Sequence, residues 1–211
     1  MISKKMMHKG IFIFILFVIY ISATPSAALE GVTHRAINEY IADKSTMISN
    51  FSFNQYLQNQ LGFQNGSEEY VNGKKVFKWI GEGGVYEDDF FRYLNHFHNP
   101  ITDQGLAGHY SALTWATGEA YRSGYSWYDV RNYYYQALTA TDKANRDYFF
   151  IQTFQGLGQV MHMVQDMAVP AHTRGDKHPK FLGIGGDPYE NWVMADKELL
   201  LREYYYPEVK A

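Results

Sequence analysis

The sequence predicts an all-α protein: one compact multi-helix domain that follows an N-terminal signal peptide. Apolar residues in its longest periodic stretch recur at spacings of 4-3-4-3-4, which is the pattern of one helix face. No alternating apolar pattern is long enough for a sheet, and the 211 residues suit one domain with a sizeable core. The helical stripe consists of Phe150, Phe154, Leu157, Met161, Val164 and Ala168.

Residues 1–28 have the three parts of a secretory signal peptide. Three lysines precede residues 11–21, an almost uninterrupted apolar run, and small residues follow at Ser26-Ala27-Ala28. The run is shorter than the roughly 20 residues that cross a bilayer, although an uncleaved anchor stays an alternative. We therefore expect cleavage after Ala28, a mature domain of residues 29–211, and secretion.

In the first half of the mature chain, helices are expected at residues 33–41, capped by Thr33, and at residues 51–61. Residues 71–80 fit either a short hairpin or a connector. Gly81-Glu82-Gly83-Gly84 is expected to be a flexible loop, and it lacks the strand-to-helix setting of a dinucleotide-binding loop.

Further helices are expected at residues 87–94, 106–121 and 126–139. The longest helix is expected from about residue 142 to residue 167. Pro170 should end or kink it, because its ring cannot continue the hydrogen-bond ladder. A loop over residues 173–188 and a last helix over residues 189–205 complete the expected order.

Composition limits the chemistry that the chain can use. It has no cysteine, so any metal must be held by His, Asp, Glu or the backbone. The net charge is −3 and no basic run lies beyond the signal peptide, so no stable nucleic-acid partner is expected. Aromatic residues make up 17% of the chain, which suits buried helix faces and also a surface that contacts apolar substrates.

The end of the longest expected helix carries potential metal ligands. His162 and Asp166 are four residues apart and share one helix face. A turn at Pro170 would bring His172 back toward them. Imidazole and carboxylate together suit zinc, although one such group alone is more often two helix histidines and a capping aspartate.

Three other segments offer similar groups at expected helix ends. They are His34, the acidic run Glu87-Asp88-Asp89 with His96 and His98 after it, and Glu190. Alone, such residues are usually capping or solvated groups at a helix N-terminus. Four segments together can hold more than one zinc ion.

The segments contain four motifs in a fixed order from Thr33 to Val193. His162-x3-Asp166-x5-His172 is the central one. Residues 95–100 read Asn-His-Phe-His-Asn-Pro, residues 189–193 read Tyr-Glu-Asn-Trp-Val, and His34 stands in Thr-His-Arg-Ala-Ile. In this order they resemble the zinc motifs of the bacterial zinc-dependent phospholipase C family, which the fungal single-strand-specific nucleases share.

The resemblance implies an all-helical fold with two or three zinc ions in a cleft, where phosphodiesters are hydrolysed. It assigns one ion to Asp88, His96, His162 and Asp166. It assigns a second ion to His172 and Glu190, and a third to His34 and a bridging Asp166. Glu87 is an alternative to Asp88 as the zinc ligand, because the spacing from this acidic residue to His96 is shorter here than in the phospholipases.

Two positions differ from the family pattern. The family has a histidine four residues before the zinc-binding glutamate, where this chain has Gly186. Either His178 or Asp176 substitutes for it, or the second ion is weakly held. The family also uses its mature N-terminal tryptophan on the third ion, whereas the expected mature end here is Leu29. The chain ends soon after the last motif, which leaves room for a missing C-terminal portion.

These observations together predict a secreted zinc-dependent phosphodiester hydrolase, most similar to phospholipase C. Zinc lowers the pKa of bound water to roughly 7 and stabilises developing phosphorane charge, so no Ser or Cys nucleophile is needed. Asp88 is the expected catalytic carboxylate, the substrate a phospholipid, and contact with a membrane surface is expected. The alternatives are a nuclease of the same fold and a non-catalytic, zinc-stabilised secreted binding domain.

Overall fold

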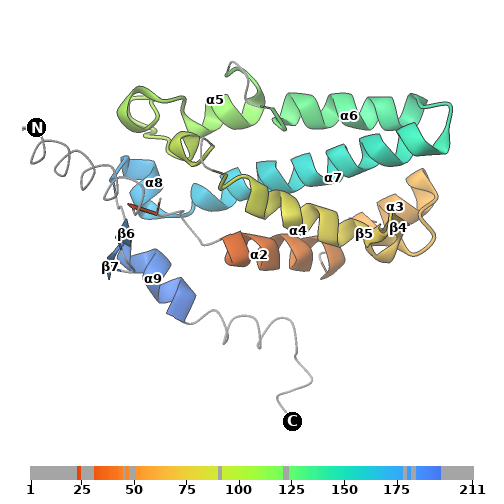
Figure 1. Ribbon diagram of the computed structural model, residues 1–211, viewed down its shortest axis with the longest axis horizontal. Helices are drawn as coiled ribbons and strands as arrows, with labels where there is room; N and C mark the ends of the chain where they lie inside the picture. The colour runs from red at the N-terminus through yellow and green to blue at the C-terminus, as the bar shows by residue number, and fades with distance from the viewer. Residues whose placement is uncertain are drawn as a thin grey trace, which may run out of the picture.

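Helices dominate the structure, a computed structural model, so the all-α prediction is confirmed at this level (Figure 1). It describes residues 23–24, 31–44, 46–47, 51–89, 92–120, 124–177, 180–181 and 184–195. The α-helices are α2 (Gly31–Lys44), α3 (Phe53–Leu61), α4 (Val76–Tyr86), α5 (Ala112–Thr117), α6 (Trp127–Thr139), α7 (Lys143–Asp166), α8 (Pro170–Arg174) and α9 (Pro188–Ala195). Short 3-10 turns are η1 (Gly66–Glu68), η2 (Tyr93–Asn95) and η3 (Leu106–Gly108).

Strands in the described residues are two residues long and pair antiparallel. They form a β2–β3 hairpin, a β4–β5 hairpin and a small β1–β6–β7 sheet. Their bounds are β1 (Ala23–Thr24), β2 (Thr46–Met47), β3 (Phe51–Ser52), β4 (Tyr70–Val71), β5 (Lys74–Lys75), β6 (Lys180–Phe181) and β7 (Ile184–Gly185). Residues 71–75 therefore belong to a short hairpin, one of the two expected alternatives, whereas residues 76–80 begin α4, which neither alternative included.

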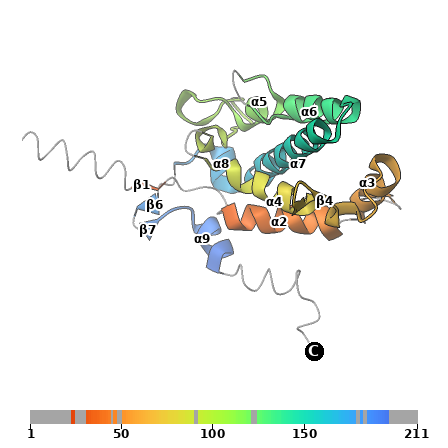
Figure 2. The same ribbon diagram turned by 45° about the vertical axis from the view of Figure 1, so that its right-hand side comes forward.

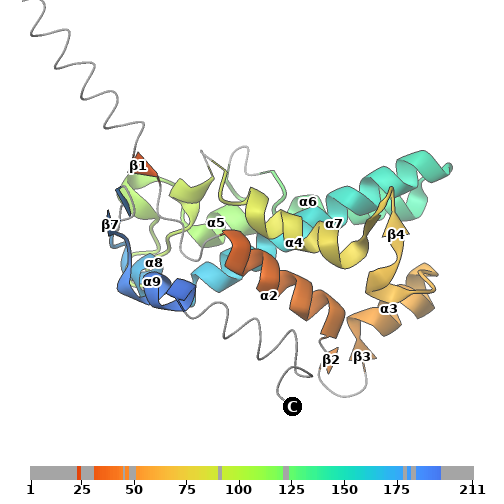
Figure 3. The same cartoon turned by 60° about the horizontal axis from the view of Figure 1, so that its bottom comes forward.

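The long helix α7 lies at the centre of the molecule. Helix α6 packs along one side of it and α4 along the other, and α2 covers α4 (Figures 1 and 2). Seen from below, α2 is in front and runs beside α4 (Figure 3). The order α6–α7–α4–α2 thus forms the body of the fold, with α3 at one end and α8 and α9 at the other.

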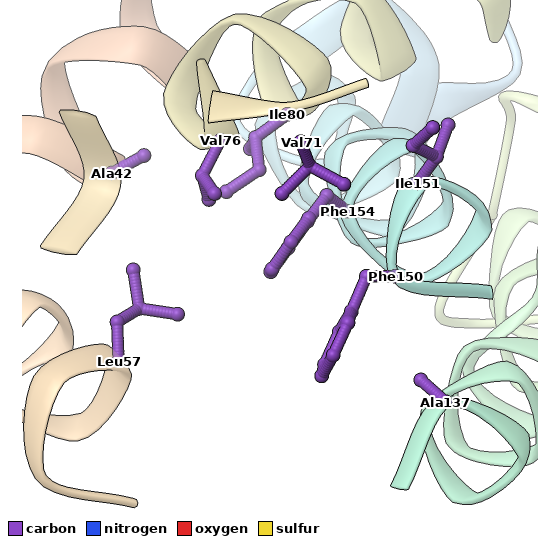
Figure 4. Close-up of a cluster of buried hydrophobic side chains, with 9 residues drawn as sticks. All are labelled: Ala42, Leu57, Val71, Val76, Ile80, Ala137, Phe150, Ile151 and Phe154. Atoms are coloured by element: carbon purple, nitrogen blue, oxygen red, sulfur yellow. The ribbon is translucent and has the colours of Figure 1, made fainter. Parts of the chain in front are cut away.

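The main apolar core fills the α3 end of this body (Figure 4). Aliphatic residues of α3 and α4 meet the stacked rings of Phe150 and Phe154 on α7. Its buried members are Ala42, Leu57, Val71, Val76, Ile80, Ala137, Phe150, Ile151 and Phe154. This apolar packing fixes the first half of α7 and leaves the second half to carry polar groups.

Helix α4 contradicts the prediction of a flexible loop at residues 81–84. These residues lie inside α4, where Gly81, Gly83 and Gly84 are buried. A β-carbon at Gly83 would overlap the backbone oxygen of Gln155, and one at Gly158 would overlap that of Ile80. Glycine costs a helix about 1 kcal/mol relative to alanine, but here it lets the backbones of α4 and α7 come into direct contact.

The predictions for α6 and α7 are confirmed, and both helices begin at capping residues. Ser126 and Asp129 form a capping box at α6, and the side chain of Asp142 caps α7. Pro170 does end the long helix, since α7 stops at Asp166, but it also opens the short helix α8.

The helices expected at residues 33–41 and 51–61 are present as α2 and α3, although Thr33 lies inside α2 and does not cap it. Two other helix predictions were wrong. Residues 106–120 form η3 and the short α5 instead of one helix, because Ala107 has a positive φ and Gly118 ends α5 in a left-handed conformation. Residues 87–94 contain a turn and the start of η2, with residues 90–91 outside the described chain. The apolar stripe fails at its end, where Val164 is 69% exposed and Ala168 is exposed.

Some expectations fall on residues that are not described. They are the signal peptide apart from Ala23–Thr24, the expected mature end at Leu29, His178, and the last helix after residue 195. Within the described part of the chain, none of the helices combines the length and apolar character needed to cross a membrane.

Candidate metal centre

The structure brings all seven predicted site residues to one end of the molecule, where α2 begins and α4 and α7 end (Figure 1). Each comes from a different element or turn, apart from the pair on α7. The residues are His34 on α2, Asp88 after α4, His96 after η2, His162 and Asp166 on α7, His172 on α8 and Glu190 on α9. All are buried apart from Asp88, whose side chain is 15% exposed.

Four of these side chains point one atom each at a common centre. His96 Nδ1 lies 2.8 Å from Asp166 Oδ2 and 3.3 Å from His162 Nε2, and the latter two atoms are 3.2 Å apart. Asp88 Oδ1 completes the group, 3.8 Å from His96 Nδ1 and 3.6 Å from His162 Nε2. Ligand atoms around tetrahedral zinc are about 3.4 Å apart, given bond lengths of about 2.1 Å, so the atoms of His96, His162 and Asp166 have the spacing of ligands of one ion.

Backbone carbonyls orient two of the histidines. His162 Nδ1 lies 2.7 Å from the oxygen of Gly84, and His172 Nδ1 lies 2.7 Å from that of His96. A carbonyl can only accept, so Nδ1 carries a proton in both rings and Nε2 is the nitrogen that can bind a metal. Metal-ligating histidines are held in this way, with the non-ligating nitrogen bonded to a backbone oxygen or carboxylate.

Asp166 connects two parts of the centre. Its Oδ2 belongs to the four-atom group, while its Oδ1 lies 3.3 Å from His34 Nε2. The ring of His34 also stacks on His162, with centroids 3.5 Å apart. The carboxylate is thus placed to bridge two ions, as the sequence resemblance implies.

The expected second position brings together fewer ligands. His172 Nε2 lies 3.7 Å from Glu190 Oε1. Gly186 forms a left-handed turn before α9, and the next residue, Asp187, caps that helix by accepting from the backbone of Glu190. Asp176 is exposed and pairs with Arg174 Nε at 2.7 Å, so it does not replace the family histidine here.

Glu87 and Asp88 occupy opposite sides of His96. Glu87 is buried and accepts from Arg92 Nε at 2.9 Å and from Trp115 Nε1 at 2.8 Å. Its Oε1 lies 3.7 Å from His96 Nε2, on the far side of the ring from the four-atom group. Asp88 is therefore the carboxylate that faces the centre, and Glu87 supports His96 from behind.

Charges in the centre shift several pKa values. Burial alone would lower the pKa of His96, but the Asp166 and Glu87 carboxylates raise it to about 10. Burial opposes a charged His162 as well, yet Asp166 and Asp88 raise its pKa. The buried Asp166 has a pKa well below its usual value because of His162 and His96, whereas burial raises the pKa of Asp88. Without a metal, protons on the imidazoles balance the carboxylates.

Several polar atoms in the centre are buried without a hydrogen-bond partner. They are His34 Nε2, His96 Nε2, Asp166 Oδ1 and both oxygens of Asp88. Asp166 Oδ2 instead faces His96 Nδ1 at 2.8 Å and His162 Nε2 at 3.2 Å. Buried polar atoms normally have partners, and leaving them unpaired costs free energy. A divalent cation would satisfy the atoms that face the centre, so the nitrogen and oxygen donors present fit a metal ion. Two overlapping ligand groups of this kind occur here, His34–Asp88–His162 and His96–His162–Asp166.

The supporting residues were not predicted from the sequence. Gln165 and Asn38 hold His34, and Gly84 holds His162. Asn38 lies four residues after His34 and therefore on the same face of α2, which is the one signal that could have found it. Gly84 acts through its backbone oxygen, which every residue has, so its residue type does not indicate this role.

Comparison with known proteins adds nothing to this geometry. No protein-family model, curated protein or solved structure matches the chain. The resemblance of the four motifs to zinc phospholipases and nucleases therefore stays a prediction.

Proposed function

We propose that the protein is a secreted zinc-dependent phosphodiester hydrolase that acts on phospholipids in the manner of phospholipase C. The observation that carries this proposal is the four-atom group, in which atoms of His96, His162 and Asp166 are spaced as ligands of one ion, while Asp88 Oδ1 lies 3.8 Å and 3.6 Å from the two histidines. Imidazole and carboxylate donors without cysteine suit zinc, and the order of the motifs points to the same metal.

Zinc bound here would supply hydroxide at neutral pH and positive charge for the developing phosphorane oxygens. The chain's own residues would hold the zinc ligands in position. His162 and His172 are held by backbone oxygens, and Glu87 supports His96, so the ligand atoms are fixed in advance. Such fixed ligands favour catalysis because little reorganisation is needed during the reaction.

Asp88 is the residue that we propose to take the proton of the attacking water. It is the most exposed residue of the centre, and both of its oxygens lack a hydrogen-bond partner. With Oδ1 turned toward His96 and His162, Oδ2 is buried without a hydrogen-bond partner and is the oxygen that would take a proton from a water bound at the centre. Burial raises its pKa, which favours proton uptake.

The surface beside Glu190 supports a lipid substrate. Tyr189 and Trp192 flank this ligand on α9, are 42% and 59% exposed, and lie with ring centroids 6.1 Å apart. Exposed Tyr and Trp side chains are typical of contacts with the boundary between water and lipid. Contact with a membrane surface is part of the proposal.

The test compares Asp88→Asn with Asp89→Asn, which changes the neighbouring exposed acid. Turnover of a short-chain phosphatidylcholine should fall about 10²–10⁴-fold in Asp88→Asn and stay unchanged in Asp89→Asn, while zinc content changes little. Equal loss of zinc and turnover would make Asp88 a ligand alone. Wild-type protein that cleaves single-stranded DNA but not lipid would be a nuclease. Zinc binding without hydrolysis of either substrate would indicate a binding domain.

A further inference from the structure

We propose that Asn38 and Gln165 are positioning residues that fix the tautomer of His34, so that its Nε2 is free to bind metal. The inference rests on the proposed metal function, because it assigns a purpose to a hydrogen-bond chain that ends at a ligand. The chain runs from the backbone of α4 and α7, through two side-chain amides, to the imidazole of His34.

The direction of the chain is set where it begins. Asn38 is completely buried, and its Nδ2 donates to the backbone oxygens of Ile80 at 3.2 Å and Gly158 at 3.0 Å. Because carbonyl oxygens only accept, the amide of Asn38 cannot be turned around without placing its oxygen against two others. Gly84 makes the position possible, since a β-carbon there would lie 2.5 Å from Asn38 Nδ2.

The orientation of the Asn38 amide determines which atom donates and which accepts in each following hydrogen bond. Asn38 Oδ1 must accept, and it does so from Gln165 Nε2 at 2.7 Å. The remaining atom of the Gln165 amide is its oxygen, Oε1, which lies 2.8 Å from His34 Nδ1. An oxygen at that distance requires a proton on Nδ1, because two lone pairs would otherwise face each other.

The result is a histidine with its lone pair on Nε2. This atom is buried, has no hydrogen-bond partner, and lies 3.3 Å from Asp166 Oδ1. The opposite tautomer would lose the 2.8 Å bond to Gln165 and gain a contact of Nε2–H with Asp166 Oδ1 at 3.3 Å, which does not have the geometry of a hydrogen bond. We therefore expect the Nδ1–H form to be the major one.

If these amides had a purely structural role, their loss would lower stability without changing the tautomer of His34. Asn38 ties α2 to α4 and α7, so its loss would lower stability in any case. Stability alone does not report the tautomer of His34. The tautomer is read from the two ring-nitrogen shifts in NMR spectra of ¹⁵N-histidine-labelled protein, recorded without metal on the full chain at mildly alkaline pH.

The decisive comparison is between Gln165→Met and Gln152→Met. Gln152 also lies on α7 and accepts from Tyr125 Oη at 2.6 Å, so its replacement removes a similar bond outside the chain. Gln165→Met should shift His34 toward the Nε2–H form, which faces the Asp166 carboxylate, whereas Gln152→Met should leave the Nδ1–H form dominant. Asn38→Leu should act like Gln165→Met if it folds.

A wild-type His34 that is mainly Nε2–H would overturn the inference, as would an unchanged tautomer ratio in Gln165→Met. A zinc titration of the same samples separates this result from the proposed function. Gln165→Met should weaken zinc binding about 10–100-fold at one ion, the usual effect of losing a group that orients a ligand. Wild-type protein that binds no zinc would refute the metal function, while the tautomer would still decide whether the chain orients His34.

Discussion

The dependence of zinc affinity on pH follows from the raised pKa of His96. In the metal-free protein this pKa is about 10, so at pH 7 the pKa exceeds the pH by 10 − 7 = 3 units. On the order of one molecule in 10³ then has His96 unprotonated and ready to bind metal. Zinc must displace that proton, and its apparent affinity should therefore rise at least about tenfold per pH unit, or about 1.4 kcal/mol, between pH 7 and 9, with any proton on His162 adding to the slope.

An ordinary histidine would behave differently. With a pKa of about 6.5, it would be unprotonated above pH 7, and zinc affinity would level off there. The assay is competition with a chromophoric chelator at each pH, together with calorimetry in buffers of different ionisation enthalpy to count released protons. His98→Gln, which changes a histidine outside the four-atom group, should keep the wild-type slope, and His96→Gln should reduce it. A flat affinity above pH 7 with no proton released would refute the reasoning.

Two further predictions concern stability. Gly158→Ala should destabilise the protein by about 1–3 kcal/mol in urea unfolding, because its β-carbon would overlap the backbone oxygen of Ile80; a change below about 0.5 kcal/mol would mean that α4 and α7 do not pack so closely. In the metal-free chain, the raised pKa of His96 stabilises the fold fully below about pH 6.5, the unfolded value, and this contribution is lost as the pH rises toward 10. The metal-free chain should therefore melt at a lower temperature at pH 9.5 than at pH 6, with the trend reversed in saturating zinc, and an unchanged melting temperature would argue against the charged cluster.

The parts of the fold that the sequence predicted best are those with local signals. Helix α7 has apolar residues at helical spacing and Asp142 at its start, and α6 has Ser126 and Asp129 as a capping box. Both signals act within a few residues, so the local sequence is sufficient to predict these two helices.

Contacts between distant segments explain the errors. Gly83 and Gly84 look like a loop until other helices are placed against them. A β-carbon at Gly83 would meet Gln155 on α7 and one at Gly84 would meet Asn38 on α2, so the advantage of glycine depends on helices distant in sequence. Val164 was expected to be buried by its spacing from Phe154. It is exposed because the last turns of α7 bury His162 and Asp166, on another face of the helix, against α2 and the turn after α4.

The candidate site also contains residues that the sequence indicated and residues that it did not. Histidine and carboxylate spacing indicated the ligands, since His162 and Asp166 must share a helix face. Spacing could not separate Glu87 from Asp88, which are adjacent in sequence. Arg92 and Trp115 make the difference by holding Glu87 on the far side of His96. The amides that hold His34 were not predicted either, because Asn and Gln occur throughout the chain and only the spacing of Asn38 from His34 pointed to one of them.

The most direct test of the metal centre is the metal content of the purified chain. The protein would be loaded with zinc at pH 8, dialysed, and analysed by elemental mass spectrometry. The geometry around Asp166, with His96 and His162 on one oxygen and His34 on the other, predicts two or three zinc ions per chain. One ion or none would contradict the proposed hydrolase.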